Sequence, residues 1–187
     1  TIDSMVAQTV RPVAWLIVDD GSRDDTPGMV ERAAQAHPWI QLYRRPDRGR
    51  RKVGGGVVEA FNDGLKRFKL DDFDYVCKLD GDLRFGPAYF ERLIEKFEAD
   101  PRLGTASGKS FLEISNRLVP ERTGDDFSQG QSKLYRVRCF QEIGGFVREV
   151  MWDGIDCHRC RMLGWKARSF HDPELRFIHL RAMGSSV

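Results

Sequence analysis

Short apolar runs alternate with amphipathic stretches along the first half of the chain. Val13–Val18, Trp39–Tyr43 and Phe73–Leu79 have the length and the β-branched or aromatic character of buried strands. The intervening segments Thr26–His37 and Gly54–Phe68 repeat apolar residues at helical spacing. Because neighbouring parallel strands need crossover connections, this alternation predicts an α/β fold with a mostly parallel sheet and helices on both faces.

The second half of the chain is less regular but continues the mixture of strands and helices. Its most polar stretch, Asn116–Gln131, contains glycine and predicts a mobile loop. No internal repeat or linker interrupts the sequence, so residues 1–187 are expected to form a single domain. The expected elements are strands over Thr105–Ile114, Ser132–Arg136, Lys166–Phe170 and Arg176–Leu180, and helices from Pro87, over Arg138–Ile143 and over Ile155–Leu163.

The composition is that of a soluble globular protein, with 41% hydrophobic and 31% charged residues. Thirty basic and 28 acidic side chains leave a net charge of +2, which provides no global field for nucleic acid or anionic lipid. No apolar run approaches the roughly 20 residues of a membrane-spanning helix. We therefore expect no nucleic-acid partner and no membrane segment in this chain.

The cysteine content favours a cytoplasmic protein. Four cysteines are too few for a disulfide scaffold, so reduced thiols are expected. Cys157 and Cys160 have the spacing of a C-x-x-C motif, but a zinc site would need a second ligand pair of similar spacing. The sequence contains none, and ordinary packing on a helix is the favoured interpretation.

Asp80, Gly81 and Asp82 follow directly after the third predicted strand. Ligands of open α/β sheets bind beyond the carboxyl ends of the strands. Side chains at positions i and i+2 of an extended segment point the same way, so Asp80 and Asp82 can face one cavity. Two such carboxylates favour a cation between them, and Mg²⁺ or Mn²⁺ prefers oxygen ligands. The alternative is a solvated Asp-Gly turn.

A second acidic pair, Asp19 and Asp20, ends the first predicted strand. A carboxylate there can accept hydrogen bonds from a nucleotide base or a ribose hydroxyl. Gly21 permits a tight turn and Ser22 can bond to the local backbone, so the alternative is again a simple turn. Both acidic motifs occur in order with two predicted helices between them, which favours one shared ligand site.

A third acidic stretch contains Trp152, Asp153 and Asp156, and we expect it in a loop that leads into the following helix. One interpretation is helix capping by Asp153 or Asp156. The other is a general base, because an acceptor hydroxyl must lose its proton as it attacks. The residues alone leave both interpretations open.

Three segments together resemble inverting family 2 glycosyltransferases of the GT-A fold: WLIVDDGSRDDT, YVCKLDGDLRF and GGFVREVMWDGIDCHRCRMLGW. The opening TIDSMVAQTVRP is similar to the helix that precedes the first of these segments in the family. The resemblance implies a Rossmann-like sheet and metal-dependent transfer of a hexose from a nucleoside diphosphate sugar to an acceptor hydroxyl, with inversion. It implies a UDP- or GDP-sugar donor, Mg²⁺ or Mn²⁺, and a carbohydrate or lipid-linked acceptor. Polysaccharide biosynthesis in the cytoplasm, or at the cytoplasmic face of a membrane, fits this scheme.

The resemblance also assigns roles on the donor side of the site. Asp19 and Asp20 match the pair that contacts the base and the ribose. Asp80 matches the first D-x-D carboxylate, near the ribose and the metal, and Asp82 matches the second, on the metal. His179 matches a histidine that often serves as an extra metal ligand in GT-A enzymes, with a packed or surface histidine as the alternative.

On the acceptor side, Asp153 matches the acidic residue expected to act as catalytic base. Trp152 stands where the family usually has glutamate, so the acceptor site is expected to differ. Trp152 and Asp156 are the candidate acceptor contacts, and packing is the alternative for Trp152.

Two further donor contacts are candidates. Ser22 follows Asp19 and Asp20, and Lys52 ends the basic run Arg44–Lys52. Such a run could clamp the donor diphosphate, although solvated basic runs are common. The glycines that follow it open a helix whose free N–H groups suit an anion.

The family begins with a strand that has no counterpart here, because the chain starts inside the helix that follows it. We therefore expect a fragment without the first strand, with an open slot in the middle of the sheet and with a further C-terminal segment outside the chain. Unpaired strand edges along such a slot should weaken stability and nucleotide affinity.

Three other functions are compatible with parts of the pattern. A sugar-phosphate nucleotidyltransferase also combines a nucleotide, a metal and a parallel sheet. A nucleic-acid-binding module would use the basic run, and its binding would weaken steeply with salt. A catalytically inert nucleotide-binding fragment would keep the fold without turnover.

Overall fold

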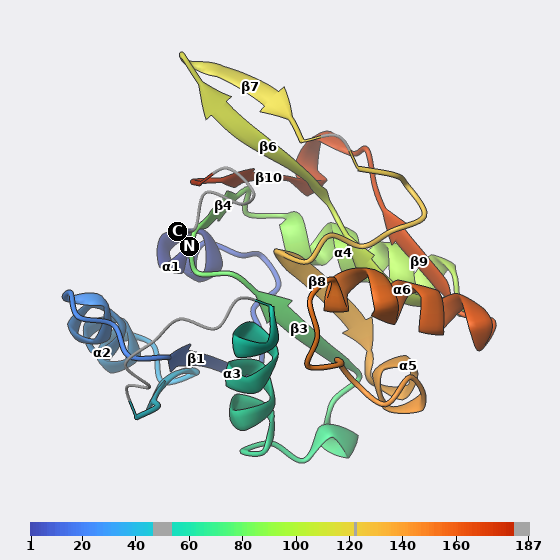
Figure 1. Ribbon diagram of the computed structural model, residues 1–187. Helices are drawn as coiled ribbons and strands as arrows, with labels where there is room; N and C mark the ends of the chain where they lie inside the picture. The colour runs from blue at the N-terminus through green and yellow to red at the C-terminus, as the bar shows by residue number, and fades with distance from the viewer. Residues whose placement is uncertain (47–53, 122, 182–187) are drawn as a thin grey trace.

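The computed structural model describes residues 1–46, 54–121 and 123–181. Helices and strands alternate through the first half of the chain, as predicted (Figure 1). The helices are α1 (Ile2–Val6), α2 (Thr26–Ala36), α3 (Gly55–Leu65), α4 (Tyr89–Ala99), α5 (Val137–Glu142) and α6 (Trp152–Met162), with 3₁₀ turns η1 (Leu70–Asp72) and η2 (Pro173–Leu175). The strands are β1 (Trp15–Asp19), β2 (Ile40–Arg44), β3 (Tyr75–Leu79), β4 (Leu83–Phe85), β5 (Leu103–Ser107), β6 (Lys109–Ile114), β7 (Arg117–Pro120), β8 (Ser132–Arg136), β9 (Lys166–Ser169) and β10 (Arg176–His179).

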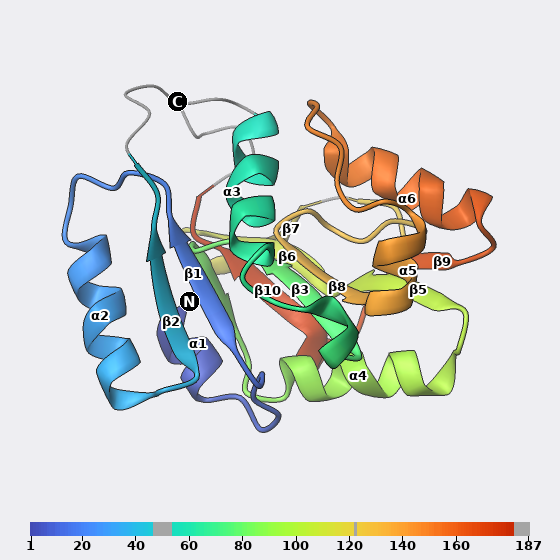
Figure 2. The ribbon, with the colours of Figure 1, turned by 90° about the horizontal axis from the view of Figure 1, so that it is seen from below.

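The strands form three sheets in the described part of the chain. β1 and β2 are a parallel pair, with α2 and α3 packed against them (Figure 2). The central sheet has the order β3-β8-β5-β9, and the third sheet has the order β4-β10-β6-β7. The α/β class is confirmed, but the sheets are only partly parallel. The antiparallel contribution comes from β8, which runs between β3 and β5, and from β4 and β7 at the margins of the third sheet.

The single strand predicted over Thr105–Ile114 is wrong, because the chain changes sheets at Gly108. β5 ends just before this glycine in the central sheet, and β6 starts just after it in the third sheet. A Cβ atom on Gly108 would collide with the backbone carbonyl of Leu175, so the close approach of these two segments requires glycine. The predicted loop over Asn116–Gln131 is also partly wrong, since it contains β7, which pairs with β6.

Helix α6 begins at Trp152 rather than at Ile155, so the third acidic stretch lies in its first turns. The residue before the helix, Met151, has a left-handed backbone with φ of 64°. Its carbonyl accepts hydrogen bonds from the N–H groups of Gly154 and Ile155. The positive φ at a non-glycine residue marks a sharply defined entry into the helix.

The core has two parts, one on each side of the central sheet. The first surrounds α4, whose buried face presents Tyr89, Phe90, Leu93 and Phe97 at helical spacing. The second joins β8, α5 and α6 through a set of aromatic and cysteine side chains. Its buried members are Val58, Tyr135, Cys139, Phe140, Ile143, Phe146, Trp152 and Cys160.

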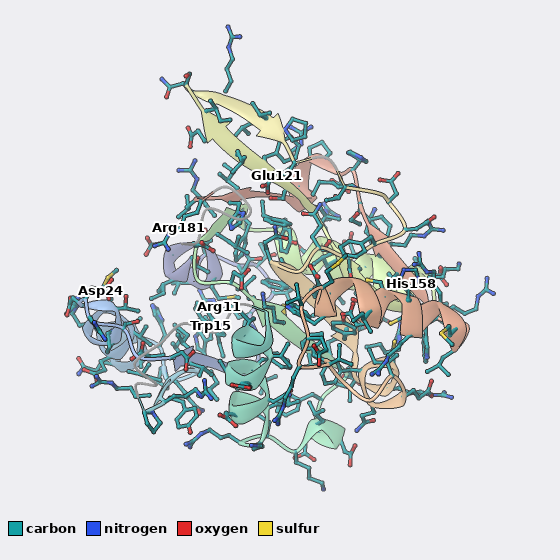
Figure 3. The ribbon with its side chains drawn as sticks, in the orientation of Figure 1. Arg11, Trp15, Asp24, Glu121, His158 and Arg181 are labelled. Carbon is teal, nitrogen blue, oxygen red and sulfur yellow. The ribbon has the colours of Figure 1, made fainter. Side chains whose placement is uncertain are left out.

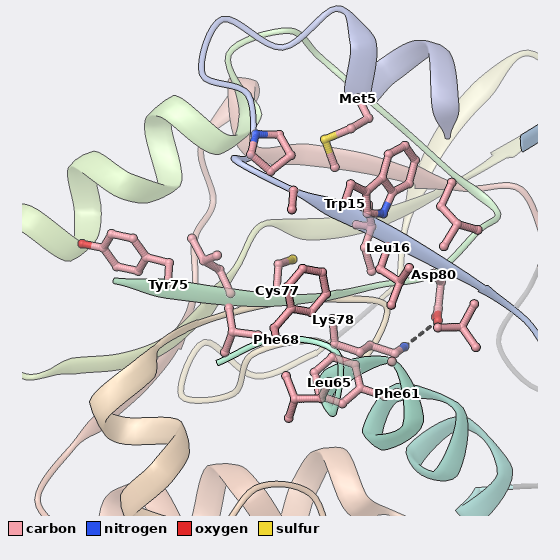
Figure 4. Close-up of a pocket in the computed structure, with 18 of the residues that line it drawn as sticks. Met5, Trp15, Leu16, Phe61, Leu65, Phe68, Tyr75, Cys77, Lys78 and Asp80 are labelled. Atoms are coloured by element: carbon pink, nitrogen blue, oxygen red, sulfur yellow. Dashed lines mark hydrogen bonds and ion pairs between the residues drawn. The ribbon is translucent and has the colours of Figure 1, made fainter. Parts of the chain in front are cut away.

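An apolar slot separates β1 from β3, and among the described residues no strand hydrogen bonds join their facing edges. It encloses about 900 Å³ and is lined mainly by the side chains of β1, β3 and α3 (Figure 4). Met5 and Phe90 also line it. The open slot predicted for the middle of the sheet is therefore confirmed.

Candidate functional site

Asp19 and Asp20 lie at the carboxyl end of β1, as predicted. Asp19 is 4% exposed, and its Oδ1 accepts a hydrogen bond from the backbone N–H of Ser22 over 2.9 Å. Gly21 supplies the left-handed residue of this turn, with φ of 93°. Asp19 and the Ser22 amide thus hold the turn together, and Asp20 is left as the more exposed carboxylate at the strand end.

Arg45 ties Asp20 to the rest of the first sheet. Its guanidinium donates to the Asp20 carboxylate and, over 2.9 Å, to Oδ2 of Asp63 on α3. Hydrogen bonds from Lys66 and then from Arg45 lower the pKa of Asp63. The basic run was one candidate clamp for the donor diphosphate, with a solvated surface as the alternative, and within it Arg45 binds carboxylates. The rest of that run, including Lys52, lies outside the described residues.

Asp80 follows β3, and its Oδ1 accepts a hydrogen bond of 2.5 Å from Lys78 (Figure 4). Lys78 is only 6% exposed and also donates to the carbonyl of Gly130 over 2.7 Å. A buried ammonium group needs such acceptors to offset its lost hydration. Asp20, Lys78 and Asp80 all line the same cavity.

Asp82 meets a different partner. The antiparallel pairing of β4 and β10 brings His179 beside it, with 3.7 Å between His179 Nε2 and Asp82 Oδ2. The imidazole is 10% exposed, and its Nδ1 lies 3.6 Å from Oε2 of Glu121. Asp80 is thus bonded to Lys78, and Asp82 lies beside His179.

Glu121 was missed by sequence reasoning. It follows β7 and lies over the third sheet near β10 (Figure 3). Its backbone N–H donates to the carbonyl of Ser110 over 2.9 Å, and its carboxylate accepts from the Ser110 hydroxyl. Nothing in the local sequence indicates this position, because it arises from the β6–β7 hairpin.

The carboxylate of Asp82 supplies the oxygen ligand that Mg²⁺ and Mn²⁺ prefer, and the imidazole of His179 supplies a nitrogen ligand, which is more typical of Zn²⁺ or Fe²⁺. No three His, Cys, Asp or Glu side chains in the described ranges are grouped tightly enough to hold a metal alone. Mg²⁺ and Mn²⁺ commonly take part of their ligand shell from substrate phosphates. An ion here would therefore need oxygen ligands from a bound diphosphate.

Asp153 lies in the first turn of α6, against Gly130. A Cβ atom on Gly130 would come within 2.6 Å of Oδ2 of Asp153, so a larger residue here would push the carboxylate aside. The Gly130 carbonyl also accepts a hydrogen bond from Lys78, the residue that binds Asp80. Gly130 therefore lies between Lys78 and Asp153. The structure thus links the Asp80 motif to the stretch that contains Asp153.

The two candidate acceptor contacts lie inside the protein. Trp152 is 8% exposed and packs against Phe146, with 4.6 Å between ring centroids. Asp156 is 1% exposed and is ion-paired with the fully buried Lys133. Burial raises the pKa of the Asp156 carboxyl, and the charge of Lys133 opposes this shift. Trp152 therefore has the packing role, and Asp156 is not accessible to an acceptor.

The cysteines are free thiols. Cys157 and Cys160 are buried on α6, and Sγ of Cys160 lies 3.5 Å from Sγ of Cys139. No helix in the described parts of the chain is both long and apolar enough to cross a membrane.

Comparison with known proteins agrees with this geometry. The chain is 28% identical over 122 residues to the poly-beta-1,6-N-acetyl-D-glucosamine synthase of Staphylococcus aureus strain COL. The matched segment is 64% of this chain and 26% of that protein, so the chain spans about a quarter of the length of the curated relatives it matches.

Two solved structures are similar along almost the whole chain. One is the mannosyltransferase PcManGT from Pyrobaculum calidifontis in complex with GDP-Man and Mn²⁺, with a TM-score of 0.68, 19% identity, and coverage of 98% of this chain and 53% of that one. The other is GalNAc-T7 with UDP, GalNAc and Mn²⁺, with a TM-score of 0.73, 14% identity, and coverage of 98% and 41%. These likenesses confirm the GT-A fold.

The sequence model of the family Glycosyl transferase family 2 matches residues 1–147 of this chain. This range is more than half of the chain and contains both the Asp19–Asp20 and the Asp80–Asp82 motifs. The chain therefore belongs to glycosyl transferase family 2.

Proposed function

We propose that this chain is the catalytic domain of an inverting glycosyltransferase that moves a hexose from a nucleoside diphosphate sugar to an acceptor hydroxyl. The contact that supports this most is the link from Asp80 through Lys78 and Gly130 to Asp153. It sets a carboxylate suited to the donor beside one suited to deprotonate an acceptor. Asp20 lines the same cavity as Asp80 and supplies the nucleotide side of the site.

In this scheme the donor lies beyond the carboxyl ends of β1 and β3. Asp20 accepts hydrogen bonds from the base or the ribose, and the free oxygen of Asp80 faces the ribose. Ser22 is kept as a donor contact through its hydroxyl, because its amide already bonds Asp19.

Asp82 and His179 would hold Mg²⁺ or Mn²⁺ together with the diphosphate oxygens. When bound, the ion neutralises the diphosphate and makes it a better leaving group. The chain itself fixes the two ligands, because Leu180 donates to the Asp82 carbonyl over 2.9 Å. Oε2 of Glu121 lies 3.6 Å from the other imidazole nitrogen, Nδ1, which has no hydrogen-bond partner among the described residues.

Asp153 is the general base in this proposal. Its carboxylate takes the proton of the acceptor hydroxyl while that oxygen attacks the anomeric carbon from the face opposite the leaving diphosphate. One displacement inverts the anomeric configuration, so no covalent sugar–protein intermediate is needed.

The relatives guide the choice of substrates. Their names mention GDP-Man, UDP with GalNAc, and a poly-N-acetylglucosamine product. We propose a UDP- or GDP-sugar donor and a growing carbohydrate or lipid-linked acceptor in polysaccharide biosynthesis, at the cytoplasmic face of a membrane.

A thermal-shift screen of nucleoside diphosphates with and without Mn²⁺ tests the donor site. We expect UDP or GDP to raise Tm only when Mn²⁺ is present, and Asp82→Asn to abolish this shift. Glu174→Gln is the matched control, since it removes an exposed carboxylate that pairs with Arg92 away from the site. An equal Tm shift in Asp82→Asn would contradict the metal assignment. Release of pyrophosphate rather than UDP or GDP during turnover would indicate a nucleotidyltransferase.

A further inference from the structure

Lys133 is an unusual core residue, because its ammonium group lies beneath the first turns of α6 with no solvent exposure. All three of its N–H donors have oxygen acceptors. Two are the carboxylate oxygens of Asp156, at 2.7 and 2.6 Å, and the third is the backbone carbonyl of Asp153, at 2.7 Å. The buried cation therefore binds the backbone of the very residue that carries the proposed base.

Asp156 is held from two other directions. The Tyr135 hydroxyl on β8 donates to its Oδ2, and the backbone N–H of Cys157 donates to its Oδ1 over 2.6 Å. Burial and the charge of Asp156 raise the pKa of Tyr135 well above its ordinary value, so the phenol keeps its proton and remains a donor. Asp156 is thus fixed to the central sheet and in turn fixes Lys133.

A second buried lysine completes the arrangement. Lys78 lies 5.2 Å and Lys133 lies 5.6 Å from the centroid of the Trp152 ring. Lys78 holds Asp80 and the Gly130 carbonyl, while Lys133 holds Asp156 and the Asp153 carbonyl. The indole packs on Phe146 and lies near the ammonium groups of both Lys78 and Lys133. Each of these ammonium groups anchors one side of the candidate site.

Stability alone does not explain this arrangement. Burying an ion pair costs desolvation energy that its attraction often fails to recover, and apolar replacements are frequently as stable. The ammonium and carboxylate groups differ from apolar side chains in that their bonds are directional. What they add is a defined geometry for the first turn of α6, next to the left-handed Met151.

We propose that Lys133 and Asp156 are positioning residues for sugar transfer, which hold the first turn of α6 so that the Asp153 carboxylate lies against Gly130 and faces the donor. This inference rests on the proposed function of Asp153. Neither side chain touches substrate, so their effect is expected on turnover and not on donor binding.

The test replaces the pair by apolar residues in the full chain, as Lys133→Met/Asp156→Leu. The assay supplies UDP-N-acetylglucosamine or GDP-mannose with Mn²⁺ and N-acetylglucosamine oligosaccharides, and it measures release of UDP or GDP. We expect an unchanged donor KM and a kcat lowered about 100-fold, the scale of a misplacement of about 1 Å. Tyr135→Phe, which removes one bond to Asp156 and keeps the ring, should lower kcat by a smaller factor.

Amide hydrogen exchange gives a readout independent of turnover. The N–H groups of Gly154 and Ile155, bonded to the Met151 carbonyl, should exchange faster in the double variant. The N–H of Leu163, bonded to the Arg159 carbonyl at the far end of α6, should not change. Equal loosening along the whole helix, or a parallel loss of donor binding and kcat, would show a merely structural role and overturn the inference.

The outcomes separate the inference from the function on which it rests. If Asp153→Asn keeps full turnover, the proposed base is wrong. If Asp153→Asn abolishes transfer while the double variant and Tyr135→Phe keep the original kcat and exchange pattern, the positioning role alone is wrong.

Discussion

The two sides of the candidate site rest on supports of different rigidity. Asp20 directly follows β1, which in the described structure has one hydrogen-bonded neighbour, β2, and borders the apolar slot on its other side. Asp80 and Asp153 are held by buried lysines that bond to the central sheet and to α6. Segments with few tertiary contacts open at lower free energy than packed ones. The side that carries Asp80 and Asp153 is therefore set rigidly by buried polar contacts, and the side that carries Asp20 can adjust.

The largest expected effect is the loss of transfer in Asp153→Asn. A general base typically contributes a factor of about 10²–10⁴ in rate, so kcat should fall by that amount while nucleotide and Mn²⁺ still raise Tm. Release of UDP or GDP measures the rate. Glu149→Gln, an exposed carboxylate shortly before α6, is the control and should keep full activity.

Removal of the buried cation should cost more stability than removal of an exposed one. Lys133→Met leaves the Asp156 carboxylate buried without its partner, and we expect a loss of about 3–5 kcal/mol in the free energy of unfolding. Lys166→Met breaks a partly exposed pair with Asp100 and should cost about 1 kcal/mol or less. Urea unfolding measures both, and equal losses would contradict the difference in rigidity.

Adding a methyl group at two glycines probes the packed and the open region directly. Gly108→Ala would press on the Leu175 backbone, so we expect a cost of about 3 kcal/mol. Gly64→Ala on α3 meets Cγ2 of Val18 at 2.8 Å and Cδ2 of Leu16 at 3.4 Å, both side-chain ends beside the slot. They can move into that space, and alanine favours the helix, so the change should stay within about 1 kcal/mol. A cost at Gly64 as large as at Gly108 would mean that the Val18 and Leu16 side chains cannot move into the slot.

The smallest expected effect is the pH dependence of the stability that Asp63 contributes through its contacts with Lys66 and Arg45. The pKa of Asp63 is lowered in the folded protein, first by Lys66 and then by Arg45. Its contribution is therefore complete above the ordinary value of 3.8 and is lost as the pH falls through the lower folded pKa. The Tm difference between the wild type and Asp63→Asn should be constant near neutral pH and should shrink below 3.8. A difference that stays constant at acidic pH would contradict this linkage.

Local pattern was sufficient to find the acidic motifs and most elements. The run from Trp15 into Asp19 and the run from Tyr75 into Asp80 both show a buried strand that ends in carboxylates. Strand ends of an open sheet share one edge, and Asp20 and Asp80 both line the cavity between β1 and β3.

The partners of these carboxylates could not be predicted in the same way. Lys78 and Lys133 occupy ordinary positions in strand patterns, where a lysine usually indicates an exposed face. Their burial depends on Gly130 and Asp156, which lie 52 and 23 residues further along the chain. Glu121 reaches His179 only because β6 pairs with β7 on one edge and with β10 on the other.

The sequence by itself determined the α/β class and the carboxylates at the strand ends, because periodicity and turn residues act over a few neighbouring positions. The open slot was expected only from the resemblance to family 2 glycosyltransferases. Only the tertiary structure decided which carboxylates remain available to ligands. Asp19 closes a turn and Asp156 is buried on Lys133, while Asp20, Asp80 and Asp153 stay accessible. That choice depends on desolvation and on hydrogen-bond partners from distant segments, which no local pattern encodes.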